Sequence, residues 1–149
     1  MCGIIGYTGP RVARDVVVAG LRRMEYRGYD SAGVAVVADG AISYRKKAGK
    51  IVNLVADLEA NPLPDSGLGI GHTRWATHGG PTDANAHPHV STGDRVALIH
   101  NGIIENFAVL RAELEAEGTE FTSETDSEAA AQLLGREVSA GVDLADAMR

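Results

Sequence analysis

The dipeptide Asp39-Gly40 separates two strand-like runs, the apolar residues 32–37 and residues 42–47, and it constrains the fold of this 149-residue chain more than any other feature. Asp-Gly between strand-like runs is typical of a two-residue β-hairpin turn, because both residues tolerate positive φ angles. A connection this short cannot make the crossover that parallel strands need. The sequence therefore predicts a largely antiparallel sheet.

Other strands and helices are expected around this hairpin. The strand-like runs are residues 2–8, 68–74 and 96–100; helical spacing of apolar residues covers 11–27, 51–58, 103–117, 125–138 and a short segment from 143. Residues 76–94 have no apolar period and are expected to form a long functional loop. The order favours an α+β fold, with helices packed on the sheet, rather than repeated βαβ units.

The helix expected from residue 125 carries the clearest markers. Thr125 and Glu128 have the spacing of a capping box, in which each side chain bonds a backbone N–H at the helix start. The side expected to be buried is apolar: Ala130, Leu133, Leu134 and Val138. Asp126 lies in the first turn, where a negative charge is favourable. It could instead bind a substrate ammonium group, and the sequence does not choose.

Composition excludes several classes of protein. The net charge of -6, without a run of basic residues, argues against binding nucleic acid or an anionic membrane. The apolar stretches, such as residues 16–19, are too short to cross a bilayer. One cysteine cannot form an intramolecular disulfide framework or a multi-cysteine metal cage. We expect a cytoplasmic globular protein without a second domain.

The single cysteine is the second residue of the chain. A lone cysteine in an apolar strand is most often a small buried hydrophobe. After removal of Met1, however, Cys2 would carry a free α-amine beside its thiol. A free α-amine has a pKa of about 7.7–8.0, and a free thiol one of about 8.5. Cys2 alone could therefore supply both nucleophile and general base for attack on an amide or acyl carbon.

Such an attack creates an oxyanion that needs fixed hydrogen-bond donors. Asn101-Gly102 interrupts a strand just before a helix, where the asparagine amide and the glycine N–H could face one concavity. The alternative is that Asn-Gly forms a simple turn with positive φ.

Residues 72–80, HTRWATHGG, place many different polar groups at the end of a strand. Arg74 could clamp a carboxylate in a bidentate manner. Trp75 could close a site or could anchor the core. Four histidines lie in this region: His72, His78, His87 and His89. A zinc site on them is disfavoured, because there is no second cysteine and His87-Pro88-His89 is a poor chelate. We expect no metal.

Together these motifs resemble the class II glutamine amidotransferases, which have an N-terminal nucleophile, and within them the glutaminase domain of the glutamine:fructose-6-phosphate amidotransferases. The resemblance extends from residue 2 to residue 128. It rests on CGIIGY (2–7), LRRMEYRGYDSAG (21–33), GHTRWATHG (71–79), NAHPH (85–89), HNGIIEN (100–106) and SETDSE (123–128). GHTRWATHG followed by NAHPH separates this family from phosphoribosyl-pyrophosphate amidotransferases, asparagine synthetases and glutamate synthases.

The resemblance implies a role for each matched residue. Cys2 would be the nucleophile, oriented by Arg27, and Asn101 and Gly102 would form the oxyanion hole. Trp75 would lie on a mobile loop that closes over glutamine and gates the passage of ammonia. The residues that would bind glutamine are Arg74, Thr77 and His78 for its α-carboxylate and Asp126 for its α-ammonium group.

The implied fold is an αββα sandwich of two antiparallel sheets. The implied reaction is hydrolysis of L-glutamine through a γ-glutamyl thioester, without a cofactor, with ammonia passing to C-terminal sugar-isomerase domains that make glucosamine 6-phosphate. Residues 1–149 are shorter than the family's glutaminase domain, so we expect a domain incomplete at its C-terminus, without the isomerase domains, that forms a homodimer. The alternative is an inactive remnant that only binds glutamine or self-associates.

Overall fold

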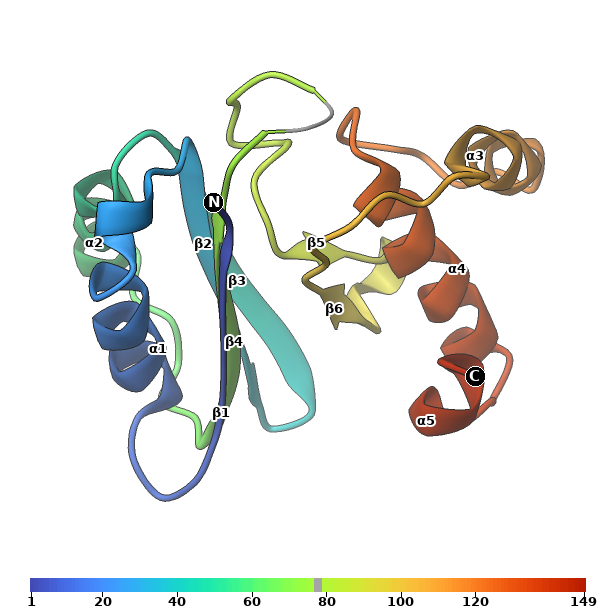
Figure 1. Ribbon diagram of the computed structural model, residues 1–149. Helices are drawn as coiled ribbons and strands as arrows, with labels where there is room; N and C mark the ends of the chain where they lie inside the picture. Colours follow the sequence, from blue (N-terminus) through green and yellow to red (C-terminus); the bar gives the residue numbers. More distant parts are fainter. Residues whose placement is uncertain (77–78) are drawn as a thin grey trace.

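The computed structural model describes residues 1–76 and 79–149 and has an α+β fold (Figure 1). Its main sheet has four antiparallel strands in the order β1-β4-β2-β3. The bounds of these strands are β1 Gly3–Thr8, β2 Ser31–Ala38, β3 Ala41–Ala48 and β4 Leu68–Arg74. Helices α1 (Ala13–Arg22) and α2 (Ile51–Ala60) cover one face of this sheet.

The later part of the chain, from β5 to the C-terminus, lies on the other side of the sheet (Figure 1). It contains a two-stranded antiparallel pair, β5 (His89–Val90) and β6 (Ala97–Leu98). Three helices follow: α3 (Phe107–Ala116), α4 (Asp126–Ser139) and α5 (Leu144–Ala147). Short 3₁₀ helices occupy Glu25–Arg27 and Thr92–Asp94. No helix in the described residues is long and apolar enough to cross a membrane.

The hairpin prediction is confirmed. Ala38 pairs with Ala41 across the turn, and Asp39 and Gly40 have φ angles of 50° and 76°. Positive φ at both central residues is the geometry that matches the right-handed twist of the two strands.

The core between the sheet and its two helices is apolar and tightly packed. Val17 and Leu21 of α1 and Leu54 of α2 are fully buried against Val34 of β2. A Cβ atom at Gly71 would lie 2.3 Å from Val17 Cγ1, so α1 approaches the sheet where β4 has no side chain.

Strand β2 is buried from Ser31 to Val36, on both of its faces. The second face is covered by the segment around His87, whose carbonyl oxygen would lie 2.1 Å from a Cβ atom at Gly33. This segment is also tied to β3, because Lys46 Nζ donates to the Ala84 carbonyl at 2.9 Å and Lys47 Nζ to Asp83 at 2.8 Å. Residues 83–87 of the predicted loop are therefore packed on the sheet.

Several boundaries in the second half differ from the prediction. The strand expected at 96–100 is shorter in the structure and consists of the two residues of β6. The helix expected from Ile103 begins at Phe107, and Ile103 is 64% exposed. Residues 99–106 instead form an irregular segment that crosses from β6 to α3. Its backbone is held by a side chain outside it: Asp126 accepts the Ile104 N–H at 2.8 Å.

The capping box predicted for α4 is wrong. Thr125 is the N-cap residue, but its hydroxyl bonds His89 Nε2 at 2.8 Å rather than a backbone N–H of the helix. Glu128 bonds the backbone N–H groups of Thr122 and Ser123, at 2.9 and 2.6 Å. The carboxylate therefore caps the preceding loop instead of the helix start.

The buried side predicted for α4 is also wrong. Ala130, Leu133, Leu134 and Val138 are only half-buried. The deeply buried residues are mostly polar or small: Asp126, Ser127, Glu128, Ala129, Ala131, Gln132 and Gly135. The buried polar groups have partners in neighbouring loops; Gln132 Oε1, for example, accepts the Thr92 N–H at 2.8 Å. Burying a hydrogen-bonded polar group is tolerated, so apolar periodicity did not decide this face.

Candidate active site

A cavity of about 170 Å³ lies beside Cys2, where the main sheet meets the segment after β6 and the start of α4. The side chains that line it come from stretches far apart in the sequence. The lining residues are Cys2, His72, Arg74, Trp75, His87, His100, Asn101, Gly102, Ile103, Thr125, Asp126 and Ser127. The fold thus brings together the cysteine, the asparagine-glycine pair, the arginine and the acidic residue that the sequence singled out.

Cys2 directly precedes β1 and is half-buried. Its Sγ accepts a hydrogen bond from the Trp75 N–H at 3.2 Å. The amine of Met1 donates to the carbonyl oxygens of Arg27 and Gly28, at 3.2 and 3.1 Å. The thiol is therefore held at the cavity wall, and the N-terminal residue lies against the 3₁₀ helix that ends at Arg27.

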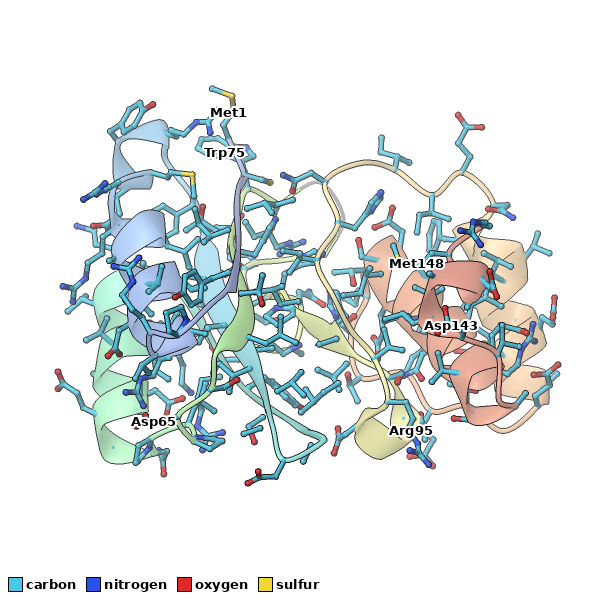
Figure 2. All side chains as sticks on the ribbon, turned by 90° about the horizontal axis from the view of Figure 1, so that it is seen from below. Met1, Asp65, Trp75, Arg95, Asp143 and Met148 are labelled. Carbon is cyan, nitrogen blue, oxygen red and sulfur yellow. The ribbon has the colours of Figure 1, made fainter. Side chains whose placement is uncertain are left out.

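Trp75 does not anchor the core, because its side chain is 55% exposed. Figure 2 shows it at the same end of the molecule as Met1. A Cβ atom at Gly28, which has a φ of 74°, would lie 2.7 Å from the Trp75 ring. Gly28 thus permits both this backbone conformation and the close approach of the indole.

Arg74 is the last residue of β4 and only 3% exposed. Its guanidinium donates to the carbonyls of Gly79 and Gly80, both at 3.1 Å, and lies 3.7 Å from the carboxylate of Asp30. Asp30 also accepts a hydrogen bond from the Ala76 N–H. The arginine and the start of the following loop are therefore held by one carboxylate. Thr77 and His78 lie outside the described residues.

Asn101 is held by His72 of β4, whose Nε2 lies 2.8 Å from Asn101 Oδ1. Gly102 does not have a positive φ, so the interpretation of Asn101-Gly102 as a positive-φ turn is wrong. A Cβ atom at Gly102 would lie 2.7 Å from His100 Nε2. The glycine therefore allows the close approach of the His100 ring.

Asp126 is the first residue of α4 and is 4% exposed. One carboxylate oxygen accepts the Ile104 N–H, as described above, and the other accepts the Ser127 hydroxyl at 3.3 Å. The Ser127 hydroxyl in turn lies 3.2 Å from His100 Nδ1. The buried Asp126 carboxylate therefore borders the cavity. Its two hydrogen bonds use only part of its capacity to accept.

Three buried histidines are clustered at the cavity, and two of them, His72 and His87, line it. The rings of His72 and His87, and those of His87 and His89, have centroids 4.5 Å apart. Burial lowers the pKa of all three below the usual value for histidine, to about 3 for His89. Within residues 1–76 and 79–149, no group of three or more histidine, cysteine or acidic side chains is arranged to hold a metal ion.

Sequence reasoning did not single out Asp30, His100 or Ser127. His100 is adjacent to Asn101 and could have been proposed on that ground. Asp30 had no such signal, because its partners Arg74 and Ala76 are more than forty positions away in the chain. Only the pairing of β2 with β4 places them together, with Ser31 opposite Arg74.

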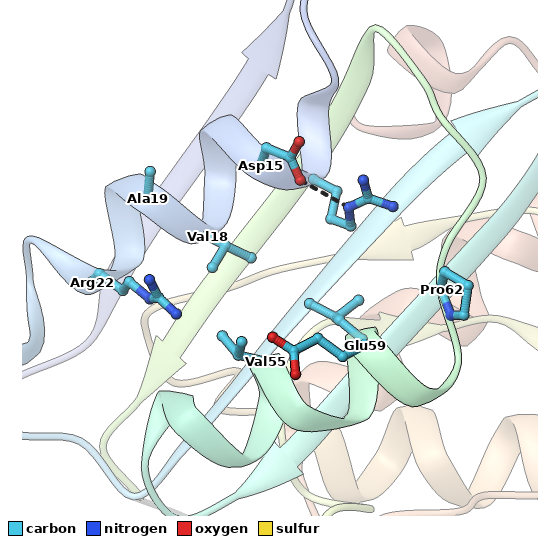
Figure 3. A pocket seen from close by; sticks show the side chains of 9 residues that line it. Asp15, Val18, Ala19, Arg22, Val55, Glu59 and Pro62 are labelled. Carbon is cyan, nitrogen blue, oxygen red and sulfur yellow. Dashed lines mark hydrogen bonds and ion pairs between the residues drawn. The ribbon is translucent and has the colours of Figure 1, made fainter.

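A larger hollow of about 600 Å³ lies between α1 and α2 (Figure 3). It is lined by aliphatic groups such as Val18 and Val55, together with Arg22 and Glu59 and the ion pair between Arg14 and Asp15. Its lining includes no cysteine, serine or histidine. The cavity beside Cys2 is therefore the better candidate for an active site despite its smaller volume.

Comparison with known proteins identifies the family. The family model described as "Glutamine amidotransferase domain" matches residues 56–148. The glutamine--fructose-6-phosphate aminotransferase [isomerizing] of Streptomyces coelicolor is 66% identical over 149 residues, which is 100% of this chain and 24% of that protein. The Mycobacterium tuberculosis enzyme of the same name is 57% identical over 139 residues, 91% of this chain and 22% of that protein. The chain thus spans about a quarter of the length of these relatives.

Solved structures share the fold. A structure described as the allosteric regulatory enzyme of purine biosynthesis has a TM-score of 0.80 and 28% identity, covering 99% of this chain and 32% of its own. Glutamine phosphoribosylpyrophosphate amidotransferase of B. subtilis has a TM-score of 0.78 and 26% identity, covering 99% and 31%. Identity to the fructose-6-phosphate aminotransferases is about twice as high, in agreement with the motif-based distinction.

Proposed function

The chain belongs to the glutamine amidotransferase family, and we propose that it hydrolyses L-glutamine to glutamate and ammonia through a thioester on Cys2. The observation that carries this proposal is a single cavity that joins the Cys2 thiol to Asn101, Gly102, Arg74 and Asp126. A nucleophile, two donors for an oxyanion and buried groups of both charges are the parts that such a reaction needs.

Substrate binding follows from the two buried charges. Arg74, with Thr77 and His78, would bind the α-carboxylate of glutamine, and Asp126 would bind its α-ammonium group. Because Arg74 and Asp126 are both almost fully buried, each gains from an opposite charge that enters the cavity. The carboxamide of glutamine then faces Cys2.

The chemistry uses only protein groups and water. After Met1 is removed, the α-amine of Cys2, oriented by Arg27, takes the thiol proton, and the thiolate attacks the carboxamide carbon. Asn101 and the Gly102 N–H stabilise the oxyanion. The C–N bond breaks, and the α-ammonium group returns the proton to the leaving ammonia. Water then cleaves the thioester to release glutamate. No metal or organic cofactor is required by these steps.

By analogy with the fructose-6-phosphate aminotransferases, the ammonia would be used to make glucosamine 6-phosphate on C-terminal sugar-isomerase domains. Trp75, exposed beside Cys2, would gate its passage. We propose that residues 1–149 are the N-terminal part of a glutaminase domain that acts as a homodimer in the cytoplasm, where a single thiol stays reduced. The native reading frame and the mass in solution test these points.

The first experiment is glutamate release from L-glutamine by the protein without Met1, with Cys2→Ala as the control. We expect turnover by the native protein and none by the variant. Covalent labelling by 6-diazo-5-oxo-norleucine should modify Cys2 and spare Cys2→Ala. Labelling without turnover would indicate a remnant that only binds glutamine. If a folded, processed protein shows no labelling and no turnover, the proposed function is overturned.

A further inference from the structure

Building on the proposed glutaminase function, we propose that His72 is a positioning residue for the oxyanion hole. Its Nε2–H holds the Asn101 side chain so that the Asn101 NH₂ group, and not its carbonyl oxygen, is available to the oxyanion formed at Cys2.

The hydrogen bond itself determines the orientation of both side chains. The 2.8 Å contact joins His72 Nε2 to Asn101 Oδ1, and an amide oxygen can only accept. A proton must therefore be on His72 Nε2, and in the neutral ring this leaves Nδ1 unprotonated. This Nδ1 is buried and has no hydrogen-bond partner among the described residues. The Nε2–H tautomer is thus the form that makes this bond.

Burial and charge keep His72 in that neutral form. The ring is fully buried on β4, and burial lowers its pKa below the usual value. The positive charge of Arg74 and the neighbouring His100 act in the same direction, while the hydrogen bond to Asn101 and the carboxylate of Asp30 act against it. A neutral ring with one tautomer is a fixed donor throughout the neutral pH range.

Asn101 needs such an anchor because it is exposed and lies in the irregular segment after β6. Rotation of its amide by half a turn would exchange its NH₂ group and its oxygen. The oxygen would then face the negative charge that develops at the carboxamide of glutamine. His72, on a central strand of the sheet, prevents this exchange, since it offers a donor and not an acceptor.

The consequence is an effect on the chemical step and not on binding. The oxyanion exists only after attack, so its donors stabilise the transition state more than the bound substrate. Removing one donor of an oxyanion hole typically slows kcat by about 10²–10³-fold. Loss of the anchor leaves the donor present but misoriented for part of the time, so we expect about a 10–100-fold loss of kcat and a KM within about threefold.

Three substitutions separate this role from a structural one. His72→Leu removes the donor. His72→Gln places an amide N–H near the position of Nε2 and should restore kcat to within about fivefold of the native value. His72→Asn is the matched control, because its amide N–H is too short to reach Asn101. Equal loss of kcat in folded Leu and Gln variants, or an effect confined to KM, would overturn the proposal.

A double-mutant cycle with Asn101→Ala asks whether His72 acts through Asn101. In that background His72→Leu should have no further effect on kcat, because there is no amide left to orient. If the two losses multiply in full, His72 acts by another route.

A readout independent of turnover keeps this inference separate from the proposed function. Long-range ¹H–¹⁵N NMR of the imidazole should find His72 neutral, with the proton on Nε2, at all pH values from 7 to 8. In His72→Leu the Asn101 amide protons should shift, and in His72→Gln they should shift less. A proton on Nδ1, or a ring that becomes charged in this range, would overturn the inference even in an inactive chain. If the spectra are as expected but no glutamate is released, only the proposed function is overturned.

Discussion

The residue that precedes Cys2 decides which group can act as the base. With Met1 in place, the chain's amine belongs to Met1 and donates to the carbonyls of Arg27 and Gly28. Cys2 then has an amide nitrogen, which cannot accept a proton from the thiol.

We therefore predict that protein retaining Met1 hydrolyses glutamine about 10²–10⁴-fold more slowly than processed protein, which is the usual contribution of a general base. Intact mass spectrometry gives the fraction processed, and glutamate release gives the rate of each preparation. A fully unprocessed chain that turns over at the rate of processed protein would contradict the role of the α-amine.

Asp126 offers a second test at the residue scale. In Asp126→Asn the side-chain oxygen can still accept the Ile104 N–H, so the local backbone should be kept. The charge opposite the substrate ammonium group is lost, which costs about 1.5–3 kcal/mol for a charged hydrogen bond and raises KM by about 10–100-fold.

The matched control for this variant is Asp143→Asn, an exposed N-cap residue of α5 that accepts the Ala145 N–H. Steady-state kinetics on glutamine should give native KM for the control. If the KM of Asp126→Asn is also native, Asp126 has only the structural role of holding the segment around Ile104.

At the scale of elements, the segment 83–87 packs on the sheet because β2 has no side chain at Gly33. The His87 carbonyl occupies the space that a Cβ atom at Gly33 would need. Residues 83–87 are therefore packed on this face of the sheet, with Lys46 and Lys47 bonded to residues 83–84.

We predict that Gly33→Ala lowers the free energy of unfolding by about 1–3 kcal/mol, the usual cost of overpacking. Gly6→Ala is the control, since Gly6 is also in a strand of the same sheet but has no atom within 4 Å of a Cβ position. It should be neutral or slightly stabilising. Urea unfolding midpoints measure both; equal midpoints would contradict the close packing of His87 on β2.

At the scale of the whole molecule, the buried histidines couple stability to pH. In the unfolded chain a histidine has a pKa of about 6.5. In the fold, burial first, and then the charges of Lys46 and Arg74 and the ring of His72, lower the pKa of His89 to about 3. Between these two values the unfolded chain binds a proton that the folded chain does not.

The free energy of unfolding should therefore fall as pH decreases below 6.5, by about 1.4 kcal/mol per pH unit for each such histidine. His89→Gln keeps a side-chain amide that can bond Thr125 but removes the titration. Its urea midpoints at pH 7 and pH 5 should differ less than those of the native protein. An unchanged difference would show that His89 is not kept neutral in the fold.

The sequence by itself determined the parts of this protein that depend on neighbouring residues. Asp39-Gly40 required a hairpin, because positive φ at two successive positions leaves the chain few other conformations. The strand 68–74 was predicted at the bounds that β4 has. The proposed nucleophile is also a local inference, since the proposed base and thiol belong to one residue, Cys2.

Only the tertiary structure decided which groups meet. The bond between His72 and Asn101 joins positions 29 apart, and the contact of Cys2 with Trp75 joins positions 73 apart. The face of α4 was decided in part in the same way, because Gln132 accepts the Thr92 N–H of a loop that lies 40 positions away in the chain. Local sequence patterns reflect the conformational preferences of residues that are adjacent in the chain. These contacts depend instead on how the strands pair and pack.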